Sequence, residues 1–248
     1  MKIIISPDPI LRRKCEPVAA EELPQMAKLA KKMARLMYKA DGCGLAAPQV
    51  GTPKQLIVLD TVLPEEGKER VQDPLIILNP RIVELGDTTE SEGEGCLSIP
   101  GITIDIERPT SVTVEALDLD GNEIEITAEG FDARALQHEL DHLEGITMFE
   151  HLDAITCATK LQEFAEAKAA GARPGDTSVG TSKDNAGGKP RGDVGGKAKG
   201  SPGARSKDDA GARSKDDPGA RPKGSSKTKR KGSVTTRRGG SAASPAGQ

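Results

Sequence analysis

The amino-acid sequence predicts an α+β fold in which antiparallel sheets pack around a central helix that carries an HExxH motif, followed by a disordered C-terminal tail. Three observations support this prediction. An amphipathic helical pattern precedes a run of short strand patterns, two further helical patterns follow the strands, and the composition changes abruptly after residue 170. Helices and strands that are grouped in this way, instead of alternating, are typical of α+β domains.

The first expected element is a helix over residues 21–40. Apolar side chains recur there at helical spacing, from Met26 to Met37. Two glutamates near its start suit the positive end of a helix dipole. Gly42 lies just beyond its end, so we expect the helix to stop there.

Short strands are expected in the middle of the chain, because apolar residues either run together or alternate with polar ones. In chain order they are residues 55–60, 75–78, 81–85, 102–106, 111–117 and 123–128, with a polar loop at 64–74. Asn79-Pro80 is expected to separate the second strand from the third. The last three strands, with a turn signal at residues 120–122, are expected to form an antiparallel meander.

Two helices are expected after the strands. The first covers residues 131–144 and is closed by Gly145, and the second covers residues 153–170. A glycine adopts the left-handed conformation that often terminates a helix at little cost, which favours a helix end at Gly145.

The chain divides into two parts of opposite charge. Residues 1–170, expected to form one catalytic domain, carry a net charge of −14, whereas residues 171–248 carry +11. Phe164 is the last aromatic residue, and no Leu, Ile or Met follows it. Such a segment cannot bury enough apolar area to offset its conformational entropy, so we expect a low-complexity basic tail over residues 171–248.

The sequence pattern excludes the membrane and secretory classes of protein. No apolar run approaches the length of about 20 residues that a membrane span needs. The N-terminal residues lack the long apolar stretch of a signal peptide, and the four cysteines include no CxxC pair. We therefore expect a soluble, cytoplasmic protein without a disulfide framework.

The clearest chemical signal is the HExxH motif of residues 138–142. Residues i and i+4 share one face of a helix, so His138 and His142 can bind one metal ion while Glu139 reaches a water molecule beside it. The chain has three histidines in all, which argues against a chance pair at this spacing.

A catalytic metal usually takes three protein ligands. The HExxH motif supplies two of them and does not identify the third. The candidates are Cys96, His151, Glu163 and Glu166. The longer pattern HExxHxxGxxH fails, because Met148 stands where its last histidine would be. Cys96 has a simpler interpretation as a small buried apolar residue, which is what most free cysteines are.

Three segments taken together resemble one known family. Residues 42–51 are GCGLAAPQVG, residues 94–98 are EGCLS and residues 137–145 are QHELDHLEG. In this order they match the GxGLAAPQxG, EGCLS and QHExDHxxG motifs of peptide deformylases without a mismatch. Taken alone, the first segment would be a tight turn before a strand. The resemblance covers roughly residues 1–165.

The resemblance implies a mononuclear metal site formed by Cys96, His138 and His142. Such sites typically hold Fe(II), with Zn, Ni or Co able to replace it. It also implies a hydrolase that removes the formyl group from the N-formylmethionine of nascent proteins and releases formate.

Further roles follow from the same resemblance. Glu139 would transfer protons, the Gln49 side chain and the backbone N–H of Leu97 would bind the oxyanion, and the backbone of Gly44 would contact the substrate. Glu94 and Arg108 match a pair that braces the cysteine loop. Cys43 departs from the family pattern, since an aliphatic residue is usual there.

Two other functions remain open from the sequence. A zincin-like endopeptidase would use His138, His142 and Glu163, but it leaves the GCGLAAPQVG and EGCLS segments unexplained. An RNA-binding or ribosome-associated protein would act mainly through the basic tail. In a deformylase, which we expect to be a monomer, the tail could hold the enzyme near RNA phosphate on the ribosome, close to its nascent substrate.

Overall fold

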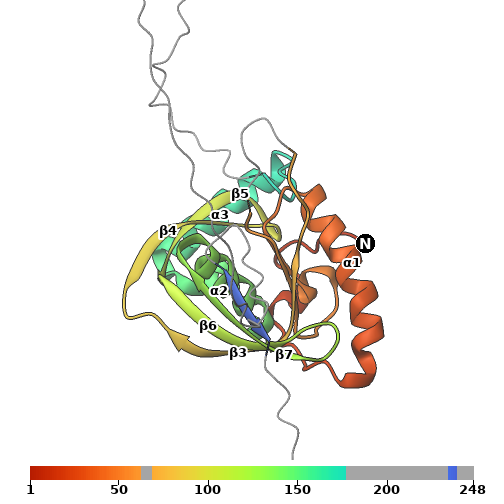
Figure 1. Ribbon diagram of the computed structural model, residues 1–248. Coiled ribbons are helices and arrows are strands. Elements are labelled where there is room, and N and C mark those ends of the chain that lie inside the picture. The colour runs from red at the N-terminus through yellow and green to blue at the C-terminus, as the bar shows by residue number, and fades with distance from the viewer. Residues whose placement is uncertain (63–68, 177–233, 239–248) are drawn as a thin grey trace, which may run out of the picture. The chain divides into compact units, whose positions relative to one another are not determined.

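The computed structural model describes residues 1–62, 69–176 and 234–238, which belong to one compact unit (Figure 1). The α-helices are α1 (Leu23–Lys39), α2 (Gly130–Glu144) and α3 (Ala154–Ala169). The strands are β1 (Gly44–Ala46), β2 (Leu56–Leu59), β3 (Leu75–Leu85), β4 (Thr89–Cys96), β5 (Ile99–Pro109), β6 (Ser111–Leu117), β7 (Glu123–Glu129) and β8 (Thr235–Arg238). In this described part of the chain, no helix has the length and apolar character to cross a bilayer.

Six strands form the larger sheet in the order β1-β2-β3-β6-β7-β8, and all neighbouring strands are antiparallel. β4 and β5 form a separate two-stranded sheet. The expected three-stranded meander is therefore wrong. Residues 111–117 and 123–128 do pair as β6 and β7, but residues 102–106 belong to β5, whose partner is β4.

The apolar face of β5 explains why it leaves the larger sheet. Ile104 and Ile106 are buried in a cluster with Phe149 and Phe164, and α3 contacts this strand. Its partner β4 was not expected, because its sequence TESEGEGC has no alternation of apolar and polar residues. Backbone pairing with β5, and not side-chain patterning, forms this strand.

β3 corrects a second expectation, because one continuous strand runs through Asn79-Pro80. Asn79 takes a left-handed backbone with φ 48°, and the pairing with β6 shifts register between Leu78 and Arg81. The Asn79 side chain accepts a hydrogen bond from the N–H of Val18 at 2.7 Å and donates one to its carbonyl at 2.8 Å. This irregularity accommodates the proline without ending the strand.

The two outer helices lie where the sequence predicts them. α1 begins after a short 3-10 helix, Ala20–Glu22, and buries Met26, Met33 and Met37. It contacts β1 and β2. α3 is capped by Asp153, whose carboxylate accepts from two backbone N–H groups of its first turn.

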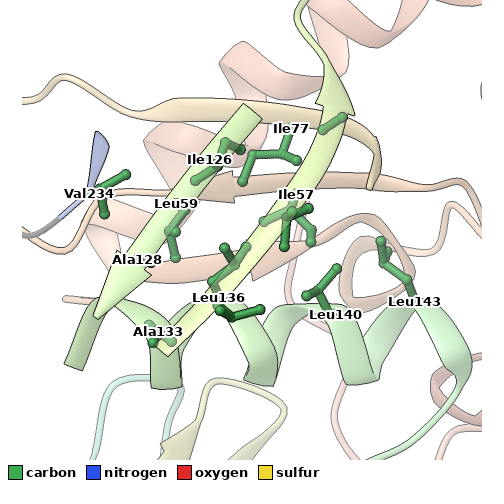
Figure 2. Packing of buried hydrophobic residues seen from close by; sticks show 14 of the residues in the cluster. Ile57, Leu59, Ile77, Ile126, Ala128, Ala133, Leu136, Leu140, Leu143 and Val234 are labelled. Atoms are coloured by element: carbon green, nitrogen blue, oxygen red, sulfur yellow. The ribbon is translucent and has the colours of Figure 1, made fainter. Parts of the chain in front are cut away.

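α2 lies in the middle of the fold and contacts strands of both sheets (Figure 1). One face of the helix presents apolar side chains at spacings of three and four residues, and these pack against the larger sheet (Figure 2). They are Ala133, Leu136, Leu140 and Leu143. Gly145 ends the helix with φ 76°, and a Cβ there would lie 2.6 Å from the carbonyl oxygen of Arg12. The apolar contacts with the larger sheet and the close approach of Gly145 to the backbone of Arg12 therefore hold α2 in a fixed orientation.

The expected disordered tail lies mostly outside the described residues, which omit 177–233 and 239–248. Two short parts of it are described. Residues 171–176 continue from α3, and Thr235–Arg238 form β8, which pairs with β7. At residues 235–238 the structure therefore differs from the expectation of disorder.

Candidate metal centre

Cys96, His138 and His142 come together from two parts of the fold. Cys96 is the last residue of β4, and both histidines lie on α2. Their ligand atoms all lie within 4.8 Å of one another, and all three residues are buried. Cys96 Sγ lies 3.3 Å from His142 Nε2. Among the described residues, this is the one group of three or more His, Cys, Asp or Glu side chains placed to hold a metal ion.

The cluster has the size and the chemistry that one transition-metal ion needs. Ligand bonds of about 2.0–2.3 Å at tetrahedral angles place two ligand atoms about 3.3–3.6 Å apart, and Cys96 Sγ and His142 Nε2 are separated by 3.3 Å. Burial, followed by the neighbouring His138 and Arg108, lowers the pKa of His142 well below its usual value. This favours the neutral imidazole that a metal requires.

Glu94 orients the first histidine. One of its carboxylate oxygens lies 2.9 Å from His138 Nδ1, which leaves Nε2 free for a metal. Arg108 donates to both carboxylate oxygens at 2.5 and 3.0 Å, and Arg134 donates to one at 2.9 Å. Burial raises the pKa of Glu94, but the hydrogen bonds from His138 and Arg108 outweigh it and lower the pKa to about 2. The sequence predicted the pairing of Glu94 with Arg108 but not the contribution of Arg134.

Glu139 is the one acid of the motif that faces a cavity. It is 5% exposed, and its Oε2 atom is buried without a hydrogen-bond partner in the described part of the protein. Burial is the main reason that its pKa rises to about 7. The cavity has a volume of about 240 Å³ and is also lined by Cys96, Leu97 and His138. A carboxylate with a pKa near neutrality is suited to both accepting and releasing a proton.

Gln49 reaches the same place from the short 3-10 helix Ala47–Val50 that follows β1. Its Oε1 accepts from the N–H of Ala46 at 2.8 Å, which turns its Nε2 toward Cys96 Sγ at 3.5 Å and Ser98 Oγ at 3.2 Å. The buried amide is therefore fixed as a donor beside the metal cluster.

Gly44 lies directly against the acid. A Cβ at this position would be 2.2 Å from Glu139 Oε1, so the close approach of β1 to α2 requires glycine. Position 42 requires glycine less strictly than position 44, because a Cβ there would be 2.8 Å from the flexible end of the Leu97 side chain.

An arginine that the sequence did not single out holds this glycine-rich segment. Arg70 donates to the carbonyl of Gly42 at 3.0 Å and lies over the ring of Tyr38, 5.0 Å from its centroid. It also donates to the carbonyl of Asp60, whose N–H donates to the Cys43 carbonyl at 2.7 Å. Arg70 lies within the expected polar loop of residues 64–74, which has no periodic pattern, so no sequence signal marked it.

The thiol of Cys43 also lines the cavity. Burial, followed by the negative charge of Glu139, raises its pKa to about 11. The side chain is therefore a neutral thiol near pH 7 and is unsuited to act as a nucleophile. It does not belong to the metal-binding cluster of the described residues.

The start of the tail contributes to the cavity as well. Gly175 and Asp176 are among the lining residues, and the carbonyl of Asp176 accepts from the N–H of Gly101 at 2.9 Å. A boundary at residue 170, which the composition indicates, leaves out these two residues. Their role depends on tertiary contact and has no signature in the sequence.

The other candidates for the third metal ligand have different partners. His151 Nε2 lies 2.7 Å from Asp141 Oδ2, which also pairs with Arg108 at 2.9 Å. Glu163 pairs with Lys160 at 2.7 Å, and Glu166 accepts from Gln162 at 3.0 Å. None of the three belongs to the metal-binding cluster of the described residues. The endopeptidase alternative, which requires Glu163, thus has no support in the structure.

A buried cluster of one cysteine from β4 and the two histidines of an HExxH helix, with a glutamate oxygen that has no partner among the described residues and faces a cavity, defines the class of metal-dependent hydrolases. Comparison with known proteins identifies the family. The model for the family described as "Polypeptide deformylase" matches residues 1–157. The chain belongs to this family, whose members are metalloenzymes that remove the N-formyl group from nascent peptides.

Individual relatives agree with the family model. The chain is 40% identical to the peptide deformylase of Rhizobium meliloti over 165 residues, which cover 66% of this chain and 92% of the relative. A peptide deformylase from Ehrlichia chaffeensis, solved in complex with actinonin, is 36% identical to this chain, with a TM-score of 0.61. The match covers 68% of this chain and 96% of the Ehrlichia chaffeensis chain. A peptide deformylase from Acinetobacter baumannii, solved with Met-Ala-Ser bound, is 34% identical to this chain, with a TM-score of 0.56. The match covers 61% of this chain and 98% of the Acinetobacter baumannii chain.

Proposed function

We propose that Cys96, His138 and His142 hold one divalent ion, which is Fe(II) in the native enzyme, while Zn, Ni or Co can replace it. The observation that carries this proposal is the buried cluster of one thiol and two imidazoles, whose donor set suits all four ions. Glu94 supports the assignment, because a carboxylate on the distal nitrogen of His138 is a common feature of metal-bound histidine.

Glu139 is the general base and then the general acid of the reaction. A divalent ion in the cluster would polarise the formyl carbonyl and lower the pKa of water from about 15.7 toward about 7. The free Oε2 of Glu139 accepts the proton of the attacking water and later delivers it to the nitrogen of the leaving amine. Formate and the free N-terminus of the peptide are the products.

Gln49 and Leu97 stabilise the negative charge that develops on the formyl oxygen. Gln49 Nε2 is held as a donor by the hydrogen bond that its own Oε1 accepts from Ala46. The backbone N–H of Leu97 follows Cys96 directly and belongs to a residue that lines the cavity. Removing one donor of this kind typically costs about 2.7–4 kcal/mol in the transition state.

The substrate lies extended beside β1. This strand is the first in the order of the larger sheet, so one of its edges has no strand partner among the described residues. The backbone of Gly44 contacts the formylmethionine, and main-chain hydrogen bonds along the edge tolerate different residues after the methionine. The Met-Ala-Ser bound to the Acinetobacter baumannii enzyme supports a peptide of this kind as ligand.

Residues 1–170 form the catalytic core, with the cavity wall completed as far as residue 176, and the enzyme acts as a cytoplasmic monomer. The basic tail draws the enzyme to the ribosome, because the core carries a net charge of −14 and would be repelled by RNA phosphate.

One experiment tests the proposal directly. The full-length protein is purified without oxygen, its metal content is measured, and turnover is assayed on formyl-Met-Ala-Ser. We expect about one ion per chain, iron in the most active preparation, and release of formate without cleavage of internal peptide bonds. Cleavage of an unformylated peptide would point instead to an endopeptidase.

A further inference from the structure

The outer edge of β7 has the features of a docking site for an extended peptide segment. Without β8, β7 would be the last strand of the larger sheet, with a row of unpaired backbone groups along its seven residues. Its side chains alternate strictly, with Ile124, Ile126 and Ala128 buried and three glutamates and Thr127 on the other face. Exposed edges of this kind readily accept another strand.

We propose that this edge is a binding site for a basic, β-branched segment, and that the chain fills it with its own residues 234–238. The inference is independent of the catalytic reaction. The tail that the sequence predicts to be free would then be attached to the domain at two points. It continues from α3 at one end, and β8 pairs with β7 near the other end.

Backbone pairing is the first support. Thr235–Arg238 run antiparallel to β7, with Thr235 opposite Thr127 and Arg238 opposite Ile124. Four consecutive pairs without a register shift extend the sheet by one strand. Main-chain hydrogen bonds of this type provide affinity in strand addition, while side chains at alternate positions provide selectivity.

The side chain that precedes the strand provides an apolar anchor. Val234 is 7% exposed and belongs to the core cluster that contains Ile126, Ala128 and Leu136. Figure 2 shows it beside the end of the sheet that carries Ala128. Residues 171–248 contain three valines, and only Val234 is followed by two further β-branched residues. The composition of this short segment therefore fits a strand, unlike its surroundings.

Charge complementarity determines which charge a segment bound at this edge must carry. Arg238 Nη2 lies 3.4 Å from Asp118 Oδ2, in the turn between β6 and β7. Arg237 lies opposite Glu125 and lines a hollow with Glu115 and Glu123. An exposed ion pair of this kind contributes little affinity by itself, but an acidic edge rejects an acidic strand. A segment with two arginines at this register is therefore preferred.

The test uses three forms of the protein: the full chain, a chain that ends at residue 233, and the full chain with Val234→Asp. A Val179→Asp variant is the matched control, since it adds the same charge elsewhere in the tail. Hydrogen exchange is measured at the amides of Ile124 to Thr127. Alternate residues of β7 point their N–H groups to β6 and to β8. We expect the amides that point to β8 to exchange at least about ten-fold faster in the shortened and Val234→Asp forms, while those that point to β6, and all amides of the control, behave as in the full chain.

A peptide with the sequence of residues 232–240 gives a second, independent measurement. It should bind the shortened chain and bind the full chain at least about ten-fold more weakly, because the edge is already occupied. A peptide with aspartate in place of the valine should not bind either form. This measurement remains informative even if Val234→Asp lowers the yield of folded protein.

Three results would overturn the proposal. These are equal exchange rates at β7 in all forms, equal peptide binding by the full and shortened chains, and a full-chain dimer that Val234→Asp dissociates. The last result would mean that the segment docks on a second copy instead of its own domain.

Discussion

The three residues proposed as metal ligands come from two elements, β4 and α2, and the cysteine is the most informative to replace. Cys96→Ala leaves two imidazoles, which is one protein ligand fewer than a tight catalytic site requires. We expect metal content after gel filtration to fall from about one ion per chain to near zero, with loss of turnover. Cys157→Ala, on α3 and outside the cluster, should keep its metal. Full occupancy in the Cys96 variant would refute the ligand assignment.

Glu139 gives a different pattern, since it does not belong to the metal cluster. Glu139→Gln should retain the ion but lower kcat by about 10²–10⁴-fold, the usual contribution of general acid–base catalysis. Metal analysis and turnover on formyl-Met-Ala-Ser measure both effects. Glu144→Gln on the same helix, whose side chain pairs with Lys14, is the control and should remain active. Loss of metal together with activity would assign Glu139 a structural role instead.

Gly44 tests the close contact between β1 and α2. In Gly44→Ala the new methyl group would lie 2.2 Å from Glu139 Oε1, so the acid must move. Displacing a catalytic group by about 1 Å can cost about 10²-fold in rate, and we expect a kcat loss of that order with the metal retained. In Gly42→Ala the new methyl group would lie 2.8 Å from the far end of the Leu97 side chain and 3.3 Å from Met37 Cγ, so this variant should lose far less activity. Equal losses in the two variants would contradict this explanation.

At the level of residues, the sequence predicted the groups that motifs fix and missed those that only tertiary contact brings in. His138, Glu139 and His142 follow from helical spacing, and the resemblance to a family added Cys96. Arg134 and Arg70 carry no local signal. Each acts by reaching a carboxylate or carbonyl that is distant in sequence.

At the level of elements, predictions succeeded where side chains are patterned by a core. The three helices and β6–β7 show clear periodicity because each buries one apolar face. β4 was missed because glutamates and glycines occupy it, and the pairing of β5 was mistaken because strand order is set by packing against α3. A local pattern determines which face of a strand is buried but not which strand lies beside it.

The segment that follows α3 makes a prediction at this level. A chain that ends after residue 176 keeps Gly175 and Asp176 in the cavity wall, whereas one that ends after Ala170 loses them. We expect the longer form to match the full chain in kcat/KM for formyl-Met-Ala-Ser. The shorter form should show a several-fold higher KM, because the peptide loses part of its enclosing surface. Identical kinetics for both forms would show that this segment does not shape the substrate site.

At the level of the whole molecule, the opposite charges of the two parts of the chain predict a salt-dependent association with ribosomes. Residues 222–248 hold seven Lys and Arg and no acidic residue. Five of these lie outside β8, and if all five met RNA phosphates, the slope of log affinity against log salt would approach about −3.5. A chain ending after residue 176 should bind ribosomes more weakly at about 50 mM salt, with unchanged turnover on free peptides. Co-sedimentation measures this, and equal binding by both forms would exclude the tether.

Among the described residues the two sheets share no strand pairing, yet the metal-binding cluster takes one side chain from β4 and two from α2, which packs on the larger sheet. An ion bound there would act as a cross-link that exists only in the folded state. At a free-ion concentration one hundred times its Kd, such a ligand raises the free energy of unfolding by about 2.7 kcal/mol. Metal supply would then govern the lifetime of the enzyme as well as its activity. In metal-starved cells, unloaded chains would unfold more often and be degraded first.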